Sequence, residues 1–536
     1  MYNLKAYSPA KDFVGSADEN VTNPQDRLRI QAYDLYENLY LNSTTTLKLV
    51  LRGDDQFPIL MPSGKKIIEA TNRFLGVNVD FLVEADGDQG TRQDLTMWWS
   101  DFWKRESFSS KFASNKRWGL VRGDAYFYVY ADVTKPAWSR ISVAELDPRQ
   151  VFEIEDGNGK LVGVHIVEKV QDFREPDKPD KQIAKRRTFR KVVDELGVVS
   201  ITSELKFFTI GKWDDRTTTQ AEDLEPVPSE FDEEPFLLSP AIQQLPVYKW
   251  RNAPLQHSSW GHSQLSGLET LLYALNQTLS DEDATMVFNG LGMYMTTAGP
   301  PRGPDGEVTD WNIGPKQIIE IGQDQRFERV TGVTDISPYQ NHMNFIDEKG
   351  LSESSGTPEV AIGRVDVAVA ESGISLQLQM MPLIAANAEK ELEIINVLDH
   401  MFYDITTMWL PAYEPESFGN PEVMSQLTVV CLFDDPMPKN RDAQVQEVIQ
   451  LDTSNLILKS MAVAKLRDLG WEYPTVDPYT GEPLDDNDIA DMLMEQVKES
   501  ASAMDPYAST SMGAEVDEFG NPIDQQQTID LGYSDA

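Results

Sequence analysis

The apolar positions in the first half of the chain predict helices followed by a run of strands. A first helix is expected from Pro24, because apolar residues recur at helical spacing at Leu28, Ala32, Leu35 and Leu39. A second is expected from Pro62 to a stop at Gly76, and the tryptophan-rich stretch 94–108 predicts a helix that continues through 109–123. Runs of β-branched and aromatic residues predict strands at 77–84, 125–133, 151–156, 160–170, 204–213 and 246–251. Residues 1–255 are therefore expected to form an α+β region whose strands follow one another as a meander.

The second half of the chain predicts long helices with short β segments between them. Residues 265–290 predict a helix of roughly 35–40 Å whose leucines share one face: Leu268, Leu271, Leu272, Leu275 and Leu279. Strand-like stretches at 292–297 and 316–321 flank a turn-rich tip, and a second helix begins at Ser337, so one helix leads out to a small β unit and another leads back. A long helical pattern at 375–410 contains Pro382, which predicts a kink. A strand at 426–433 and helices over 439–500, one of them capped by Ser454, complete the pattern.

A short segment between two of these helices has the period of a strand. It reads GRVDVAVAESG over 363–373, with valines alternating with Asp366 and Ala368. Gly363 and Gly373 bracket it and permit sharp turns at its ends. It is either a loop that projects from the helices or a β-hairpin arm packed on the α+β region.

The charge of the chain narrows its possible binding partners, and its cysteine content narrows the compartment in which it works. The chain carries 87 acidic and 47 basic residues, a formal net charge of −40. Such a chain repels DNA on average, so high-affinity nucleic-acid binding is not expected unless the basic residues are segregated. The one cysteine, Cys431, excludes an internal disulfide framework and fits a reducing compartment. The first residues resemble no signal peptide, and no stretch approaches the roughly 20 apolar residues of a membrane span. We therefore expect a soluble intracellular protein with no membrane partner.

Basic residues do gather in one stretch, which contains Lys178, Lys181, Lys185, Arg186, Arg187, Arg190 and Lys191. One interpretation is a solvated hairpin end or loop. The other is an anchor for an acidic neighbour or a nucleic acid. The acidic, proline-marked stretch 221–235 that follows is expected to be a surface loop.

No motif in the sequence indicates an enzyme. The chain has neither a GxxxxGK[ST] phosphate loop nor an HExxH pair, and its five histidines show no ligand spacing. We therefore expect no catalytic residues, no cofactor and no metal. The aromatic helix with Trp98, Trp99 and Trp103 is expected to fill a core or a subunit interface, with a stacking surface for bases or sugars as the alternative.

The order of parts from residue 255 onward resembles a portal protein of tailed double-stranded-DNA bacteriophages, of the siphophage type. The likeness rests on the pattern W-G-H-S-x-L-x-G-L-x-x-L over 260–271, on a helix ending at Phe288-Asn289-Gly290, and on the β excursion with its returning helix. It rests also on Ser372-Gly373-Ile374-Ser375-Leu376, which opens the long helix. Ser375 departs from the small apolar residue, usually alanine, expected there. The resemblance covers roughly residues 25–500, and order and spacing carry it.

The resemblance implies an α+β, mainly helical portal fold that assembles into a ring of twelve. It implies an α/β wing, a two-helix stem, a small β clip, a tunnel loop, a long kinked helix and a helical crown. Along the chain these are a flexible N-terminus at 1–24, wing at 25–262, first stem helix at 263–289, clip at 290–335, second stem helix at 336–356, tunnel loop at 357–373, long kinked helix at 374–404, wing again at 405–437, crown at 438–500 and a disordered acidic tail at 501–536.

The resemblance also implies what the site residues would do. Tunnel-loop residues would line the channel: Gly363, Arg364, Val365, Asp366, Val367, Ala368, Val369 and Ala370. Residues of the clip tip would contact the packaging motor and later the connector: Pro300, Pro301, Arg302, Asp305 and Glu307. Leucines of the first stem helix would pack against a neighbouring subunit or the returning helix: Leu268, Leu272, Leu275 and Leu279.

The implied function is a structural one, the DNA channel at one capsid vertex through which the genome is packaged and ejected. Double-stranded DNA would pass through without sequence-specific binding. The implied partners are the large terminase subunit, a head–tail connector or adaptor, and the major capsid and scaffolding proteins. The protein would be assembled in the host cytoplasm and located in the virion. The alternatives are another virion structural or adaptor protein and an acidic intracellular polysaccharide hydrolase.

Overall fold

The computed structural model describes residues 24–44, 46–51, 56–85, 89–156, 160–175, 177–178, 181–195, 197–209, 227, 231–254, 259–291, 293–302, 304–308, 323–330, 335–363, 373–436, 441–454, 456–469, 471, 473, 484 and 486–503. By its internal contacts the chain divides into two compact units, Met1–Pro436 and Met437–Ala536. It is a mixed α and β protein with several sheets, in agreement with the class expected from the sequence.

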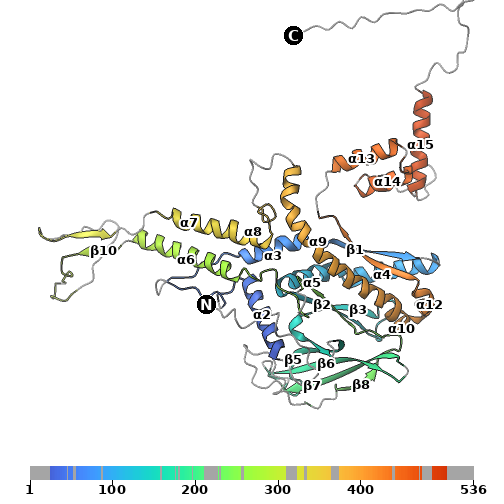
Figure 1. The fold of residues 1–536 in the computed structure, drawn as a ribbon, viewed down its shortest axis with the longest axis horizontal. Coiled ribbons are helices and arrows are strands. Elements are labelled where there is room, and N and C mark those ends of the chain that lie inside the picture. The colour runs from blue at the N-terminus through green and yellow to red at the C-terminus, as the bar shows by residue number, and fades with distance from the viewer. Residues whose placement is uncertain are drawn as a thin grey trace, which may run out of the picture. The chain divides into compact units, whose positions relative to one another are not determined.

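Antiparallel sheets form the β part of the first unit (Figure 1). One sheet places β2 Asp124–Ala131 between β3 Ile141–Leu146 and β9 Val247–Arg251. Another is the expected meander, in which each strand pairs with the next: β4 Val151–Glu155, β5 Leu161–Gln171, β6 Gln182–Val193, β7 Val199–Thr209 and β8 Glu233–Leu237. β1 Val77–Ala85 pairs with β12 Leu427–Asp434, which ties the start of the unit to its end.

Helices from the first part of the chain pack with these sheets: α2 Pro24–Tyr40, α3 Ser63–Arg73, α4 Gln89–Arg105 and α5 Phe108–Arg122. The expectation of one continuous helix through 94–123 is wrong. The chain breaks at Ser107, which has a left-handed φ of 50°. Because residues other than glycine rarely adopt this conformation, the serine gave no sign of the break.

The tryptophans of α4 belong to the core, as expected. Trp98 and Trp99 are fully buried and Trp103 is half-buried. The Trp99 ring meets Phe402 edge-on, with the ring centroids 4.9 Å apart. Because Phe402 comes from the long helix α9 Gly373–Asp404, these aromatic contacts join α4 to a segment far away in the sequence. The alternative of a stacking surface for bases is therefore wrong for Trp98 and Trp99.

The basic run forms a strand for most of its length, so the interpretation as a loop is wrong there. Residues 182–193 are β6, and Lys185 and Arg187 form ion pairs with Glu168 and Glu233, both at 3.1 Å. Lys185 stands opposite Glu168 of β5 in the strand register, so this ion pair joins neighbouring strands. Of the acidic stretch 221–235, the part from Glu233 belongs to β8, and most of the remainder lies outside the described residues.

A helical arm interrupts the first unit. It consists of α6 Glu269–Leu291, the paired strands β10 Met293–Thr296 and β11 Phe327–Val330, and a returning helix. The returning helix is built from α7 Ser337–Asn344, a π-helix Phe345–Ser352 and α8 Glu353–Ser355. Figure 1 shows α6 and α7 side by side with β10 beyond their far ends. After the arm comes α9, which continues through Pro382.

The second unit is helical among the residues described. Its helices are α13 Arg441–Thr453, α14 Lys459–Asp468 and α15 Asp486–Ala503, and its small core contains Val463, Ile489 and Ala490. The expectation that Ser454 caps a helix is wrong, because α14 begins at Lys459 after Leu458. The tail from 504 onward lies outside the described residues. None of the described helices is both long and apolar enough to cross a membrane.

Candidate functional site: the helical arm and its root

The arm is held together by contacts between α6 and the returning helix. Gln340 donates a hydrogen bond to Glu282 at 3.3 Å, and the hydroxyls of Thr285 and Tyr339 lie 3.5 Å apart. Nearer the root, a side chain at Gly350 would lie 3.3 Å from a methyl carbon of Leu271. The absence of a side chain at Gly350 therefore lets the two helices come close together at that level.

The leucine face of α6 is buried inside the chain. Leu268, Leu272 and Leu275 are buried and Leu279 is half-buried. The sequence left two neighbours open for this face, another subunit or the returning helix. Leu271 does face the returning helix, but Leu272 lies against α3, where its side chain would be 3.5 Å from a Cβ added to Gly64. The face is thus part of the core that fixes the arm to the body.

The WGHS segment fixes the position from which α6 starts. A Cβ at Gly261 would overlap the carbonyl oxygen of Gly123 and lie 2.7 Å from that of Asn252. The Gly261 amide donates to the buried carboxylate of Asp124 at 2.9 Å, and His262 N donates to Asn252 O at 2.7 Å. Both glycines are therefore required for a close backbone contact between the end of α5 and the segment before α6.

Two cations lie close to the ring of the tryptophan of the same segment. The Arg29 guanidinium is 3.9 Å and the Lys249 amine 4.2 Å from the Trp260 ring centre. Arg29 is fully buried and donates to the carbonyl oxygens of Pro148 and Val151 at 2.7 and 3.0 Å. Since cations bind favourably over an indole ring, most strongly when desolvated, Trp260 links α2 and β9 to the start of the arm.

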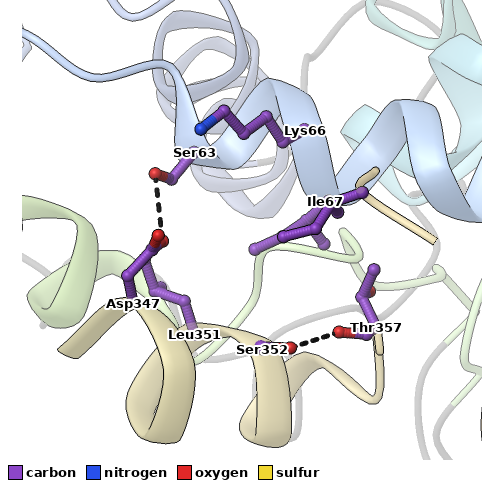
Figure 2. Close-up of a pocket in the computed structure, with 8 residues that line it drawn as sticks. Ser63, Lys66, Ile67, Asp347, Leu351, Ser352 and Thr357 are labelled. Atoms are coloured by element: carbon purple, nitrogen blue, oxygen red, sulfur yellow. Dashed lines mark hydrogen bonds between the residues drawn. The ribbon is translucent and has the colours of Figure 1, made fainter. Parts of the chain in front are cut away.

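At the root of the arm, a small cleft separates the returning helix from α3 (Figure 2). Its lining comes from α3, from the π-helix and from the segment after it: Ser63, Lys66, Ile67, Asp347, Leu351, Ser352, Thr357 and Ile362. Ser63 donates to Asp347 at 3.4 Å, and Ser352 donates to the Thr357 carbonyl oxygen at 2.5 Å. The cleft thus lies where the chain leaves the arm toward 363–373.

The predicted channel residues lie almost wholly outside the part of the chain that the structure describes. Arg364 to Ala370 are not among the described residues, and Gly363 is the last one before them. Gly363 has a φ of 89°, and a Cβ added there would have no atom within 4 Å. The position therefore needs glycine for its backbone conformation rather than for space. Both interpretations of 363–373, the projecting loop and the packed hairpin arm, stay predictions.

The predicted tip residues lie beyond the far end of the helix pair. Arg302 pairs with Val308 through an isolated antiparallel bridge, and Gly306 turns the chain with a φ of 78°. Pro300, Arg302, Asp305 and Glu307 are exposed, and Pro301 is half-buried. These side chains are therefore accessible for contacts with another molecule.

Sequence reasoning also missed a polar cluster at the end of α9. The buried carboxyl of Asp404, at the end of α9, accepts a hydrogen bond from Tyr248 of β9 at 2.9 Å. His400, one turn earlier on α9, has its Nε2 3.5 Å from the same carboxyl oxygen. Burial raises the pKa of Asp404, and the neighbouring His400 opposes that rise. Because Tyr248 and Asp404 are far apart in the chain, no local pattern could have indicated this contact.

The cysteine and the possible metal-binding side chains complete the description of the site. Cys431 lies buried in β12, and burial raises the pKa of its thiol. No cluster of three or more His, Cys, Asp or Glu side chains suited to a metal ion occurs among the residues described. No protein-family model matches this chain, and no curated protein matches it either.

Proposed function

We propose that this chain is the subunit of a bacteriophage portal, a ring that forms the DNA channel at one capsid vertex. The observation that supports this best is the arm. One helix leads out from an α/β body, a β pair follows at its far end, and a second helix leads back to the body. The long helix α9 and the β12 strand then return the chain to the sheet where it began.

In this proposal each part of the chain has a mechanical role. The α6–α7 pair is the stem, the β10–β11 pair and the exposed residues around Arg302 are the clip, and 363–373 is the tunnel loop. The clip would dock the large terminase subunit during packaging and a head–tail connector afterwards. The proposal assigns no catalytic step and no cofactor to the chain.

The charge of the chain supports passage of DNA without retention. Twelve copies would carry about −480 charges (12 × 40). A basic channel would hold a polyanion by releasing its counterions, whereas a mainly acidic one lets it slide. The basic strand β6 does not contradict this, since Lys185 and Arg187 are paired with carboxylates.

The test is the mass and shape of the purified full-length protein. Size-exclusion chromatography with light scattering should give about 725 kDa (12 × 60.4 kDa), and electron microscopy should show rings with a central hole. A stable species near 60.4 kDa would contradict the proposal and favour a monomeric function. A closed oligomer without a central hole would favour another virion structural protein.

A further inference from the structure

The first half of α9, residues 373–393, is held on the body by different contacts from those of the second half. Ile394, Leu398 and Phe402 of the second half are fully buried and belong to the large core of the first unit. Met380 and Leu383 of the first half are buried as well, but they lie outside that core. The large core therefore fixes the second half of the helix and not the first.

Polar side chains face the body over the last turns of the first half. Asn387 is buried, and Lys390 and Glu391 are half-buried, whereas Ala388 and Leu392 are exposed, Leu392 at 63%. A surface helix normally buries its apolar side chains and exposes its charged ones. Because the pattern is reversed here, this part of α9 rests on the body through groups that prefer water.

These polar groups form hydrogen bonds with uncharged partners. The Lys390 amine donates to the side-chain oxygen of Gln264 at 2.5 Å, and the Glu391 carboxylate accepts from the Gly76 amide at 2.7 Å. Asn387 donates to a backbone oxygen of α3 at 3.2 Å, and its own side-chain oxygen has no hydrogen-bond partner within the described part of the chain. Hydrogen bonds of this kind fix the position of the helix but do not neutralise a buried charge.

The Lys390 amine has no carboxylate to offset its burial. None of the residues that the structure describes forms an ion pair with it. The nearby acids on α9 act on other cations, since Glu391 interacts electrostatically with Lys116 of α5 and Glu393 pairs with Arg251 of β9 at 3.4 Å. Burial lowers the pKa of the Lys390 amine to about 8. The folded state therefore favours the uncharged amine.

A proline lies within the first half of α9. Pro382 has no N–H, so one of the hydrogen bonds between successive helical turns is not made. Segments with few core contacts open separately from the rest of a domain. The first half of α9 has these features, and Ile394 marks the point from which the large core holds the helix.

We propose that Lys390 is a proton-controlled anchor of the first half of α9. With an uncharged amine this half stays seated on the body, and with a charged amine it opens while the second half stays fixed in the core. The physical reason is that an ammonium group regains its hydration when the helix opens, whereas an uncharged amine gains much less. The inference concerns the single chain and does not rest on the proposed ring.

The direction of the pH dependence follows from the lowered pKa of Lys390. The contribution of the uncharged amine to the closed state is complete above pH 10.5 and is lost as the pH falls through about 8. The first half of α9 should therefore open more often near neutral pH than in mildly alkaline solution.

Thiol labelling measures the opening. Leu383→Cys places a thiol at a position of the first half that is 2% exposed. The buried Cys431, whose amide donates to Asp399 of the second half at 2.6 Å, reports on the part that stays closed. The full-length protein is treated with a thiol reagent under native conditions, and mass spectrometry of its peptides gives the rate at each site. The introduced thiol should react at least about tenfold faster than Cys431, because only the first half opens locally.

Lys390→Met tests the role of the charge. In the Leu383→Cys background it should slow labelling of the introduced thiol about tenfold near pH 7, and the difference should shrink toward about pH 10, where the parent amine is also uncharged. The ratio of the two rates at each pH cancels the ionisation of the thiol itself. Lys349→Met is the matched control, because Lys349 is exposed and pairs with Glu353 at 2.6 Å, and it should leave the rate unchanged.

Equal labelling rates for Lys390→Met and its parent would overturn the inference, as would a difference that stays constant with pH. An introduced thiol that reacts no faster than Cys431 would show that α9 opens only when the whole unit unfolds. Hydrogen exchange of the unmodified protein needs no variant: the amides of 383–393 should exchange before those of 394–404, and equal protection would contradict local opening. None of these results depends on the mass of the oligomer, so failure of the proposed ring would leave the anchor standing.

Discussion

At the scale of single residues, the start of α6 depends on two glycines that touch each other. Gly123 has a φ of 105°, and both Gly123 and Gly261 lack room for a Cβ because each faces backbone atoms. Backbone atoms cannot move aside as the end of a flexible side chain can. The W-G-H-S pattern is one of those on which the resemblance to portal proteins rests. In this chain its glycine, Gly261, is required by the close backbone contact with Gly123.

Replacing Gly261 by Ala should therefore destabilise the first unit strongly. Overpacking typically costs about 1–3 kcal/mol, and a clash with two carbonyl oxygens belongs at the upper end of that range. Urea unfolding followed by tryptophan fluorescence measures the loss. Gly299→Ala is the control, because no atom lies within 4 Å of an added Cβ there. Equal midpoints for the two variants would show that the Gly123–Gly261 contact is not as close as described.

The buried carboxyl of Asp404 should make stability depend on pH. Tyr248 of β9, His400 of α9 and Lys191 of β6 are the titratable groups that act on it, and burial outweighs them to raise its pKa above the ordinary 3.8. The folded state therefore favours the protonated acid. Its contribution to stability is complete below pH 3.8 and is lost as the pH rises through the raised pKa.

Asp404→Asn, which imitates the protonated acid, should then stabilise the protein increasingly as the pH rises from about 4 toward about 7. Thermal unfolding at a series of pH values measures the difference between variant and parent. Asp132→Asn is a useful control, since hydrogen bonds from Thr134 lower the pKa of the Asp132 carboxyl, the opposite direction to that of Asp404. A difference for Asp404→Asn that stays constant with pH would contradict this account.

At the scale of elements, the sequence predicted those helices and strands whose formation depends mainly on residues close together in the chain. Apolar spacing found α2 and α3, and β-branched runs found β1, β2 and β12 close to their bounds. Patterns failed where a long-range contact decided the outcome. β6 looked like a loop because it has many cations and no apolar alternation, and it is a strand because it pairs with β5 and β7 on its two sides. The break at Ser107 and the start of α14 were missed because neither has a glycine or a capping side chain to mark it.

The leucine face of α6 supports folding of the single chain. Mutations in this face should therefore lower the stability of the unassembled chain. Leu275 is fully buried within the first unit. Leu275→Ala should cost about 2–5 kcal/mol through lost contacts and a residual cavity, and the loss should appear in urea unfolding of unassembled protein. Leu279→Ala, at a half-buried position, should cost clearly less. If Leu275→Ala weakened assembly and left unfolding unchanged, the face would belong to a subunit contact instead.

The arm tip should matter for docking and not for folding. Arg302, Asp305 and Glu307 are exposed, and exposed changes usually alter stability by less than about 0.5 kcal/mol. Reversing or removing these three charges together should leave the melting temperature and the oligomer mass unchanged, while binding to the large terminase subunit falls. Pull-down with purified terminase measures the effect. Normal binding by the triple variant would exclude the tip as the docking surface.

At the scale of the whole molecule, the order of the helices and strands was predictable, but several contacts between distant parts of the chain were not. The outgoing helix α6, the strand β10 and the returning helix could be inferred because each has its own period and stop signal. The second strand predicted at 316–321 lies outside the described residues, and the strand that pairs with β10 is β11. The cleft at the arm root, the hydrogen bond between Val50 and Gln277, and the cations around Trp260 could not, because their partners are separated by long stretches of chain. The residues that would line a channel lie beyond Gly363, outside the described part of the chain.

Those residues carry the last prediction, which tests the molecule as a conduit. If 363–373 faces DNA in a ring of twelve, replacing Val365, Val367 and Val369 by Lys adds 36 positive charges (3 × 12) around the channel. Counterion release would then favour held DNA, with an affinity that falls steeply as salt rises. Rings should assemble normally, stall packaging at low salt and recover partly at high salt. Replacement of the same valines by Thr, which adds no charge, is the control. The measurement is the length of packaged DNA as a function of ionic strength. Coincident curves for the Lys variant and the parent would show that this segment does not face DNA. The interpretation of 363–373 as a hairpin arm packed on the body would then be favoured.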